Sequence, residues 1–378
     1  MTGEAGLDPL LHALPAGAHE AIFWREIVPD VLDVAPPVPD PWVIILGGRA
    51  GSGKTYLKRS LLLDREHQDH LAGRPAARPV DLGTDELRDY HPRWRRLLRD
   101  DDITAAFYTA HDCRRWVDEA VAYCTARHLS EPGLGGPKSL VLDTQLNDPD
   151  RARELISRFR ASGYRTVHVA FAAVSVPMSQ LGALQRYWEQ RQHLGGGRFA
   201  ADPGASDPGI LATAEMIDRE HLADIVEVHR RGDTAAVYRN VLTGRGRWQN
   251  QPRTPEALTA EWNRPWDREE SIWFAERCAE LADQLGQRWW PELADATRRA
   301  ASLSHPDVDL SGLARRLASR EPPAPGSATA GRAGELPSPP APAPGGRAGR
   351  RSGRQPGKPR GPQPGRLPQL RRPGPKNC

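Results

Sequence analysis

Residues Gly47-Gly48-Arg49-Ala50-Gly51-Ser52-Gly53-Lys54-Thr55 contain a full match to the phosphate-binding pattern G-x-x-x-x-G-K-[ST]. The unbroken apolar run Val43 to Leu46 precedes this stretch, and a helical pattern from Lys54 to Leu63 follows it. A strand, a glycine-rich turn and a helix are the context in which this pattern binds phosphates. The stretch therefore predicts an α/β fold of the P-loop NTPase type, with a parallel sheet flanked by helices.

Each part of this loop has an expected role. Backbone N–H groups at the glycines turn inward around anionic oxygens, where a Cβ would block the approach. Lys54 reaches the β- and γ-phosphates of ATP, and Thr55 offers its hydroxyl to Mg²⁺. The predicted cofactor-binding residues are Gly48, Arg49, Ala50, Gly51, Ser52, Gly53, Lys54 and Thr55.

Apolar runs alternate with amphipathic helical patterns along the rest of the chain, as in an α/β protein. Further strands are expected at 79–82, 139–143, 166–171 and 224–228, and helices at 18–33, 105–127 and 149–162. Gly163 is expected to end the last of these helices. Gly232 and Asp233 predict a hairpin turn, and helices dominate from Pro255 to Arg320.

Tryptophan is dense in this C-terminal helical region, with residues Trp262, Trp266, Trp273, Trp289 and Trp290. Such a density is compatible with a ligand surface. Tryptophans at helical spacing are more often core residues, so we interpret the group as packing.

The composition changes sharply at Glu321. The last 58 residues contain 15 Pro and 11 Gly, so they offer too little apolar surface to offset chain entropy. The predicted domains are an N-terminal helical segment (1–40), a P-loop kinase domain (41–245), a helical tryptophan-rich extension (246–320) and a disordered Pro/Gly/Arg-rich tail (321–378).

The tail has a net charge of +9, with eleven Lys and Arg against two Glu. The net charge of the whole chain is +4, so the remaining 320 residues carry +4 − 9 = −5. A basic arm can bind nucleic acid or an acidic partner by charge alone. The tail has no aromatic residue for base stacking, which favours a solvated extension without a ligand.

The cysteines at 113, 124, 278 and 378 have no metal-ligand spacing and no paired pattern, so reduced thiols are expected. The sequence has no signal segment and no apolar run of membrane-spanning length. We expect a soluble, cytoplasmic protein.

Asp85 follows the second predicted strand, at the carboxyl edge of the sheet. A carboxylate beside the phosphate loop can accept a proton from an attacking hydroxyl, and it can equally cap a helix. Asp89 is the weaker candidate because its position predicts a solvated helical face.

The sequence resembles the zeta toxin family, phosphate-loop kinases that use ATP to phosphorylate UDP-N-acetylsugars. Six blocks carry the resemblance: 47–55 (GGRAGSGKT), 85–92 (DELRDYHP), 116–121 (WVDEAV), 141–146 (VLDTQL), 163–164 (GY) and 185–189 (QRYWE). The resemblance spans roughly residues 20–240, and the order of the blocks is more specific than the loop alone.

The resemblance implies roles for particular residues. Asp85 matches the general base, Lys54 the loop lysine, and Arg186 and Arg198 the two arginines that steady the transferring phosphoryl group. The implied substrate-binding residues are Arg88, Glu119, Asp143 and Gln145. Asp143, at the end of an apolar strand, is alternatively a ligand that holds Mg²⁺ through water.

The chain departs from the family pattern in its acceptor region. The family has Glu-x-Thr where this chain reads Asp143-Thr144-Gln145, and Ala205-Ser206-Asp207 replaces a His-Asp pair. The loop 131–138 is longer than in the family.

Three functions remain open at this point. The first is a kinase of a UDP-N-acetylsugar cell-wall precursor, restrained by an antitoxin protein. The second is a kinase of another small hydroxylated compound, such as an antibiotic or nucleoside. The third is a nucleotide-gated binding module with a basic tail.

Overall fold

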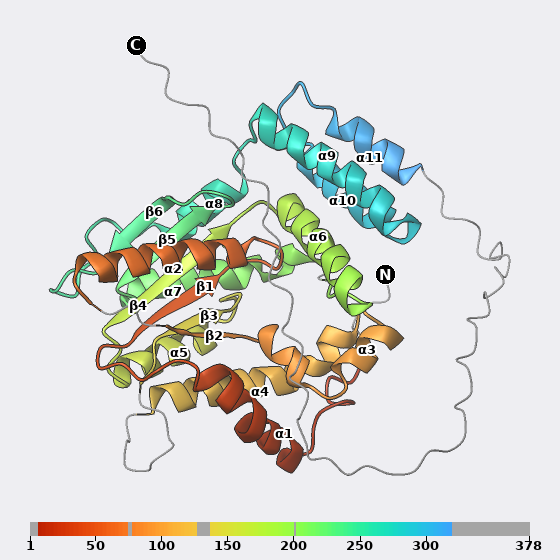
Figure 1. The fold of residues 1–378 in the computed structure, drawn as a ribbon. Helices are drawn as coiled ribbons and strands as arrows, with labels where there is room; N and C mark the ends of the chain where they lie inside the picture. The colour runs from red at the N-terminus through yellow and green to blue at the C-terminus, as the bar shows by residue number, and fades with distance from the viewer. Residues whose placement is uncertain (1–6, 75–77, 127–136, 200–201, 320–378) are drawn as a thin grey trace, which may run out of the picture. The chain divides into compact units, whose positions relative to one another are not determined.

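The computed structural model describes residues 7–74, 78–126, 137–199 and 202–319. The strands are β1 (Trp42–Gly47), β2 (Val80–Gly83), β3 (Leu140–Asp143), β4 (Thr166–Ala173), β5 (Ile225–Arg230) and β6 (Ala236–Val241). They form one sheet in the order β2-β3-β1-β4-β5-β6. The first five strands run parallel, and β6 pairs antiparallel with β5 (Figure 1).

The helices surround this sheet. The α-helices are α1 (Ala16–Ile22), α2 (Lys54–Leu71), α3 (Trp94–Asp100), α4 (Ala105–Thr125), α5 (Pro149–Ala161), α6 (Val176–Leu194), α7 (Asp207–Glu220), α8 (Thr254–Trp262), α9 (Arg268–Leu285), α10 (Trp290–Ala300) and α11 (Leu310–Ala318). The π-helix η1 (Phe23–Leu32) and the 3-10 helices η2 (Glu86–Tyr90), η3 (Pro203–Ser206) and η4 (Gln287–Trp289) complete the described helical structure.

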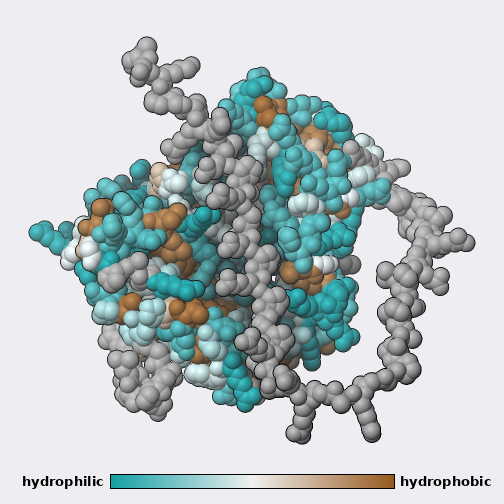
Figure 2. Space-filling view, viewed as in Figure 1, coloured by the Kyte–Doolittle hydropathy of each residue, from teal (hydrophilic) through white to brown (hydrophobic). Residues whose placement is uncertain are grey.

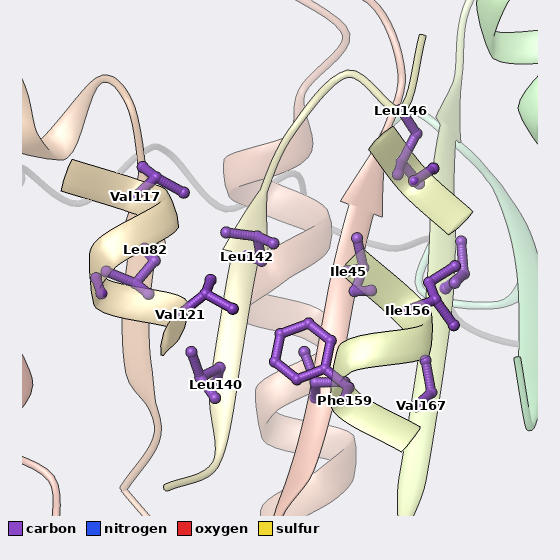
Figure 3. Packing of buried hydrophobic residues seen from close by; sticks show 14 of the residues in the cluster. Ile45, Leu82, Val117, Val121, Leu140, Leu142, Leu146, Ile156, Phe159 and Val167 are labelled. Atoms are coloured by element: carbon purple, nitrogen blue, oxygen red, sulfur yellow. The ribbon is translucent and has the colours of Figure 1, made fainter. Parts of the chain in front are cut away.

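Both faces of the sheet are covered. Leu57 and Leu61 of α2 pack on one face against Trp42 and Ile44 of β1. Helices α4 and α5 cover the other face, where their side chains meet those of β1 to β4 (Figure 3). The labelled residues of this cluster are Ile45, Leu82, Val117, Val121, Leu140, Leu142, Leu146, Ile156, Phe159 and Val167.

This burial explains the apolar runs of the parallel strands. Every residue of β1 is buried, as expected for a strand covered on both faces. The edge strand β6 instead alternates between more and less exposed residues. The carboxyl ends of β1, β2 and β3 meet at one edge of the sheet, which is where ligands bind in folds of this type.

The predicted strands and helices are confirmed, with boundary differences of a few residues. Gly163 follows α5 with φ of 78°, as expected for a residue that ends a helix, and Gly232 at the β5–β6 turn has φ of 87°. The helix expected at 18–33 differs in its second half, where η1 is a π-helix. Pro29 lies inside η1 and has no N–H to donate to a regular helical hydrogen bond.

The C-terminal helices α9 and α10 pack beside α6, and α11 packs against α10 and α9 (Figure 1). Their shared hydrophobic cluster includes Tyr187 of α6, Trp266, Phe274 and Trp289. The packing interpretation holds for Trp262, Trp266 and Trp289, which are buried. Trp273 differs, since 42% of its surface is exposed.

Hydrophilic residues make up most of the described surface seen in Figure 2, with hydrophobic residues in small groups. Cys113, Cys124 and Cys278 are buried free thiols, and burial raises the pKa of each to about 12. Within the described ranges, the helices lack the combination of length and apolar character that a membrane crossing needs. The predicted tail, 321–378, and Cys378 lie outside the described residues.

Candidate active site

The phosphate-binding loop joins β1 to α2 at the carboxyl edge of the sheet. Gly48 and Gly51 have φ of 123° and 79°, in the region that side chains rarely adopt. A Cβ on Gly51 would lie 2.3 Å from the Ser179 carbonyl oxygen of α6, so only glycine fits there. This close approach brings α6, which carries Arg186, against the loop.

Lys54 begins α2 and closes the loop onto itself. Its Nζ donates to the carbonyl oxygens of Gly48 and Arg49, at 3.1 Å each, and lies 3.7 Å from a carboxylate oxygen of Asp143. Burial lowers the pKa of Lys54, and Asp143 partly offsets that effect. The lysine is therefore held at the floor of the site, next to where phosphate oxygens would lie.

The Arg49 side chain turns away from the loop. Its guanidinium donates to both carboxylate oxygens of Asp207 at the start of α7 and to the Val174 carbonyl, and it lies 4.0 Å from the ring centroid of Trp262. The side chain is buried, with 2% of its surface exposed. The expectation that Arg49 binds the cofactor therefore extends only to its backbone, because the side chain anchors the loop.

Asp85 lies at the start of η2, directly after β2, and arginines from three segments converge on it. The Nε of Arg88 donates to Asp85 over 3.3 Å, Arg186 of α6 lies 3.8 Å away, and Arg198 pairs directly with the carboxylate. Asp85 makes no capping hydrogen bond to η2. Burial alone would raise the pKa of Asp85, but Arg198, Arg88 and Arg186 outweigh it and hold the pKa below the usual value.

Arg186, one of the two arginines that the resemblance implied, is held differently from Arg88. Arg88 is fixed by α4, since it donates to the Ala106 carbonyl and to the Thr109 hydroxyl. Arg186 has its Nε and Nη2 buried without a hydrogen-bond partner. Buried donors without partners are costly, so these atoms indicate room for an anionic acceptor such as a phosphate oxygen.

Thr55 and Asp143 fit the ligand requirements of Mg²⁺. Thr55 lies on the first turn of α2 with its side chain exposed, and Asp143 ends β3 beside Lys54. Mg²⁺ is held in kinase sites by one or two protein oxygens, while water and phosphate supply the rest. No cluster of three or more His, Cys, Asp or Glu placed for a metal is found among the described residues.

A pocket of about 830 Å³ opens beside these residues. Its lining includes Lys54, Asp85, Arg88, Asp143, Gln145, Arg186 and Arg198.

Glu119 is not part of this lining. Its carboxylate lies 3.6 Å from His19 Nδ1 and 3.8 Å from Arg115. Successive residues of an α-helix are rotated by about 100° about its axis, so Glu119 points away from the direction of its neighbour Asp118. Asp118 lines the pocket instead.

Sequence reasoning missed the far wall of this pocket. Asn147, Asp148 and Arg151 line it from the start of α5, and Arg114 and Asp118 line it from α4. An ion pair of 2.7 Å joins Arg151 to Asp118 across the two helices. The position of residues 147 to 151 directly after β3 is the signal that could have found them, since ligands lie at the carboxyl ends of parallel strands.

The sheet order, the glycine loop and the lysine beside the Asp143 carboxylate define a P-loop protein of the α/β class. The model of the zeta toxin family matches residues 29–243, which is more than half of the chain. The chain belongs to the zeta toxin family. Members of this family are ATP-dependent kinases.

One solved structure shares the fold at low sequence identity, and others match the chain more weakly. A chain from the PezAT chromosomal toxin–antitoxin system of the human pathogen Streptococcus pneumoniae is 18% identical, with a TM-score of 0.54; the match covers 73% of this chain and 99% of that one. Complexes of AvrRxo1-ORF1 with AvrRxo1-ORF2, one with sulphate ions and one with ATP, are 12% identical with TM-scores of 0.41. These matches cover 80% of this chain and 88% and 89% of those chains. No curated protein matches this chain in sequence.

Proposed function

We propose that this protein is an ATP-dependent kinase that phosphorylates a hydroxyl of a UDP-N-acetylsugar. One observation carries the proposal: Arg186 and Arg198 gather around Asp85, and Lys54 lines the same pocket, which is large enough for a small molecule. Phosphoryl transfer requires positioned cations around the moving group and a base for the attacking hydroxyl. The family of the chain supports the same reaction.

In the proposed reaction, the acceptor oxygen bonds to the γ-phosphorus as the bond from that phosphorus to the bridging oxygen of ADP breaks. Asp85 accepts the proton of the hydroxyl. Arg186 and Arg198 stabilise the charge on the transferring group, for which a planar guanidinium is well shaped. Thr55 and, through water, Asp143 would hold Mg²⁺, which would supply positive charge beside the phosphates.

The arginines around Asp85 also explain how the base becomes available. Without ATP, the ion pairs with Arg198 and Arg88 hold the pKa of Asp85 low, which makes the carboxylate a weak base. A γ-phosphate competes for the guanidinium groups of Arg186 and Arg198, whereas Arg88 stays held by α4. When Arg186 and Arg198 bind the phosphate in place of Asp85, the pKa of Asp85 rises. The carboxylate is then a stronger base when the acceptor hydroxyl must lose its proton.

A second acceptor class is favoured by the position of Glu119. This residue does not line the pocket, so one of the sugar contacts that the resemblance implied is missing. The pocket wall offers Arg114, Asp118 and Arg151 in its place. An antibiotic or a nucleoside with a free hydroxyl is therefore the alternative acceptor. We also propose that an antitoxin protein binds this chain, and membership of the zeta toxin family is the support for that partner.

The acceptor is tested by incubating the purified protein with ATP, Mg²⁺ and single acceptors. The panel contains UDP-N-acetylglucosamine, UDP-N-acetylmuramic acid, nucleosides and an aminoglycoside, and mass spectrometry detects the gain of one phosphate. We expect that gain on a UDP-N-acetylsugar and none with the Lys54→Ala variant. A gain on another compound alone selects the second acceptor class, and no gain on any compound contradicts the kinase.

The basic tail is expected to be dispensable for turnover. The pocket residues lie between positions 50 and 198, and the last described helix ends at Ala318. Truncation after Arg320 should leave the turnover of the panel substrate unchanged. A truncated protein that folds, binds ATP and fails to turn over would instead favour the tail-dependent binding module. Circular dichroism and the mass-spectrometric assay measure both properties.

A further inference from the structure

Trp273 lies on α9 with 42% of its surface exposed, whereas Trp262, Trp266 and Trp289 of the same region are buried. The guanidinium carbon of Arg231 lies 5.6 Å from the centroid of its ring. An exposed indole held against a cation is a suitable platform for stacking a planar aromatic ligand.

Arg231 connects this indole to the phosphate-binding loop. A Cβ placed on Gly53 would lie 3.6 Å from Arg231 Cγ, and one placed on Gly182 of α6 would lie 3.0 Å from Nη1. Arg231 donates to the Met178 carbonyl over 3.4 Å, and in the described part of the chain no carboxylate forms an ion pair with it. The side chain thus fills the space between the loop and Trp273, and the carboxylate of Glu189 only partly offsets the burial that lowers the pKa of Arg231.

The chemistry of the site sets the direction in which a nucleotide leaves the loop. In-line transfer places the acceptor and the leaving ADP on opposite sides of the γ-phosphorus. Asp85 and the acceptor pocket lie on one side of Lys54, and Gly53, Arg231 and Trp273 are not part of the pocket lining. The nucleoside therefore extends away from that pocket. Gly53 lies beside the Arg231 side chain, and the Arg231 guanidinium lies beside Trp273, so a nucleotide that extends this way meets Arg231 first and Trp273 next.

We propose that the base of the nucleotide stacks on Trp273, with Arg231 beside the ribose and the α-phosphate. This inference rests on the proposed function and adds a part that the family match does not contain. Trp273 lies beyond residues 29–243, so the C-terminal helices complete the nucleotide site. Because stacking tolerates any base, the platform gives affinity for a nucleotide over a bare polyphosphate.

The test compares the binding of ATP and of inorganic tripolyphosphate to the full-length protein by calorimetry with Mg²⁺. Trp273→Ala should weaken ATP binding by about tenfold or more and leave tripolyphosphate binding unchanged. Trp24→Ala is the matched control, since Trp24 of η1 is 45% exposed and packs beside Tyr123 of α4. It should change neither affinity.

Unchanged ATP affinity in Trp273→Ala overturns the inference, as does an equal loss for both ligands. Tyr56 on the first turn of α2, 48% exposed, is the competing platform. Suppose that Tyr56→Ala loses the preference for ATP over tripolyphosphate while Trp273→Ala leaves both affinities unchanged. The base then stacks on α2, and this result also overturns the inference. If neither ligand binds the unaltered protein, the proposed function fails together with this inference. If both bind and Trp273→Ala is silent, only the inference fails.

Discussion

Lys54→Ala is expected to reduce the rate of phosphoryl transfer by about a hundredfold to a thousandfold. The Nζ of Lys54 lies over the loop between the Gly48 and Arg49 carbonyl oxygens and the Asp143 carboxylate, where phosphate charge develops. No apolar core contact depends on this amine, so the fold should remain intact. Circular dichroism and the mass-spectrometric assay are measured on the same sample.

Lys58→Ala is the control for this variant. Lys58 lies one turn further along α2 and has the same exposed fraction, 12%, but its Nζ pairs with Asp81 at 2.7 Å. Removing it takes away an equal charge from the same helix without touching the loop. Normal turnover in Lys54→Ala, or an equal loss in both variants, would remove the specific role of the loop lysine.

Asp85→Asn should lower turnover by roughly a hundredfold to ten-thousandfold, the usual contribution of a general base. The affinity for ATP should not weaken, because the substitution leaves Arg186 and Arg198 in place and removes the carboxylate that competes for them. Asn serves as a helix cap about as well as Asp, so a capping role alone predicts little change. Calorimetry with ATP and the turnover assay separate the two properties.

Asp89→Asn is the matched control, since Asp89 is exposed in the same 3-10 helix and lies outside the pocket lining. Its turnover should equal that of the unaltered protein. Near-normal turnover of Asp85→Asn would leave the proposed kinase without its base and return Asp85 to a structural role at the start of η2.

Local patterns were sufficient to predict the strand, loop and helix around Lys54. The apolar run Val43 to Leu46 is typical of a strand covered on both faces, and the phosphate-loop spacing that follows it supports that prediction. The convergence of Arg186 and Arg198 on Asp85 was different. Residues about a hundred positions apart meet through the order of strands, which periodicity does not specify, so their roles came from family resemblance.

Other features of the site depended on contacts that no local pattern encodes. Arg49 pairs with Asp207, 158 positions away, so a loop residue proved to be an anchor. Glu119 and Asp118 are adjacent in sequence, and only the rotation of α4 decides which one lines the pocket. The exposure of Trp273 likewise depends on how α9 packs beside α6.

The anchoring of Arg49 has a consequence for the thermodynamics of nucleotide binding. Ordering the backbone of one residue costs about 1–2 kcal/mol of conformational entropy, and a glycine-rich loop is otherwise expensive to order. Because Asp207, Val174 and Trp262 already fix residue 49, that ordering occurs during folding and not when the ligand arrives. The loop is preorganised, so contacts made by the phosphates contribute to affinity without an offsetting loss of loop entropy.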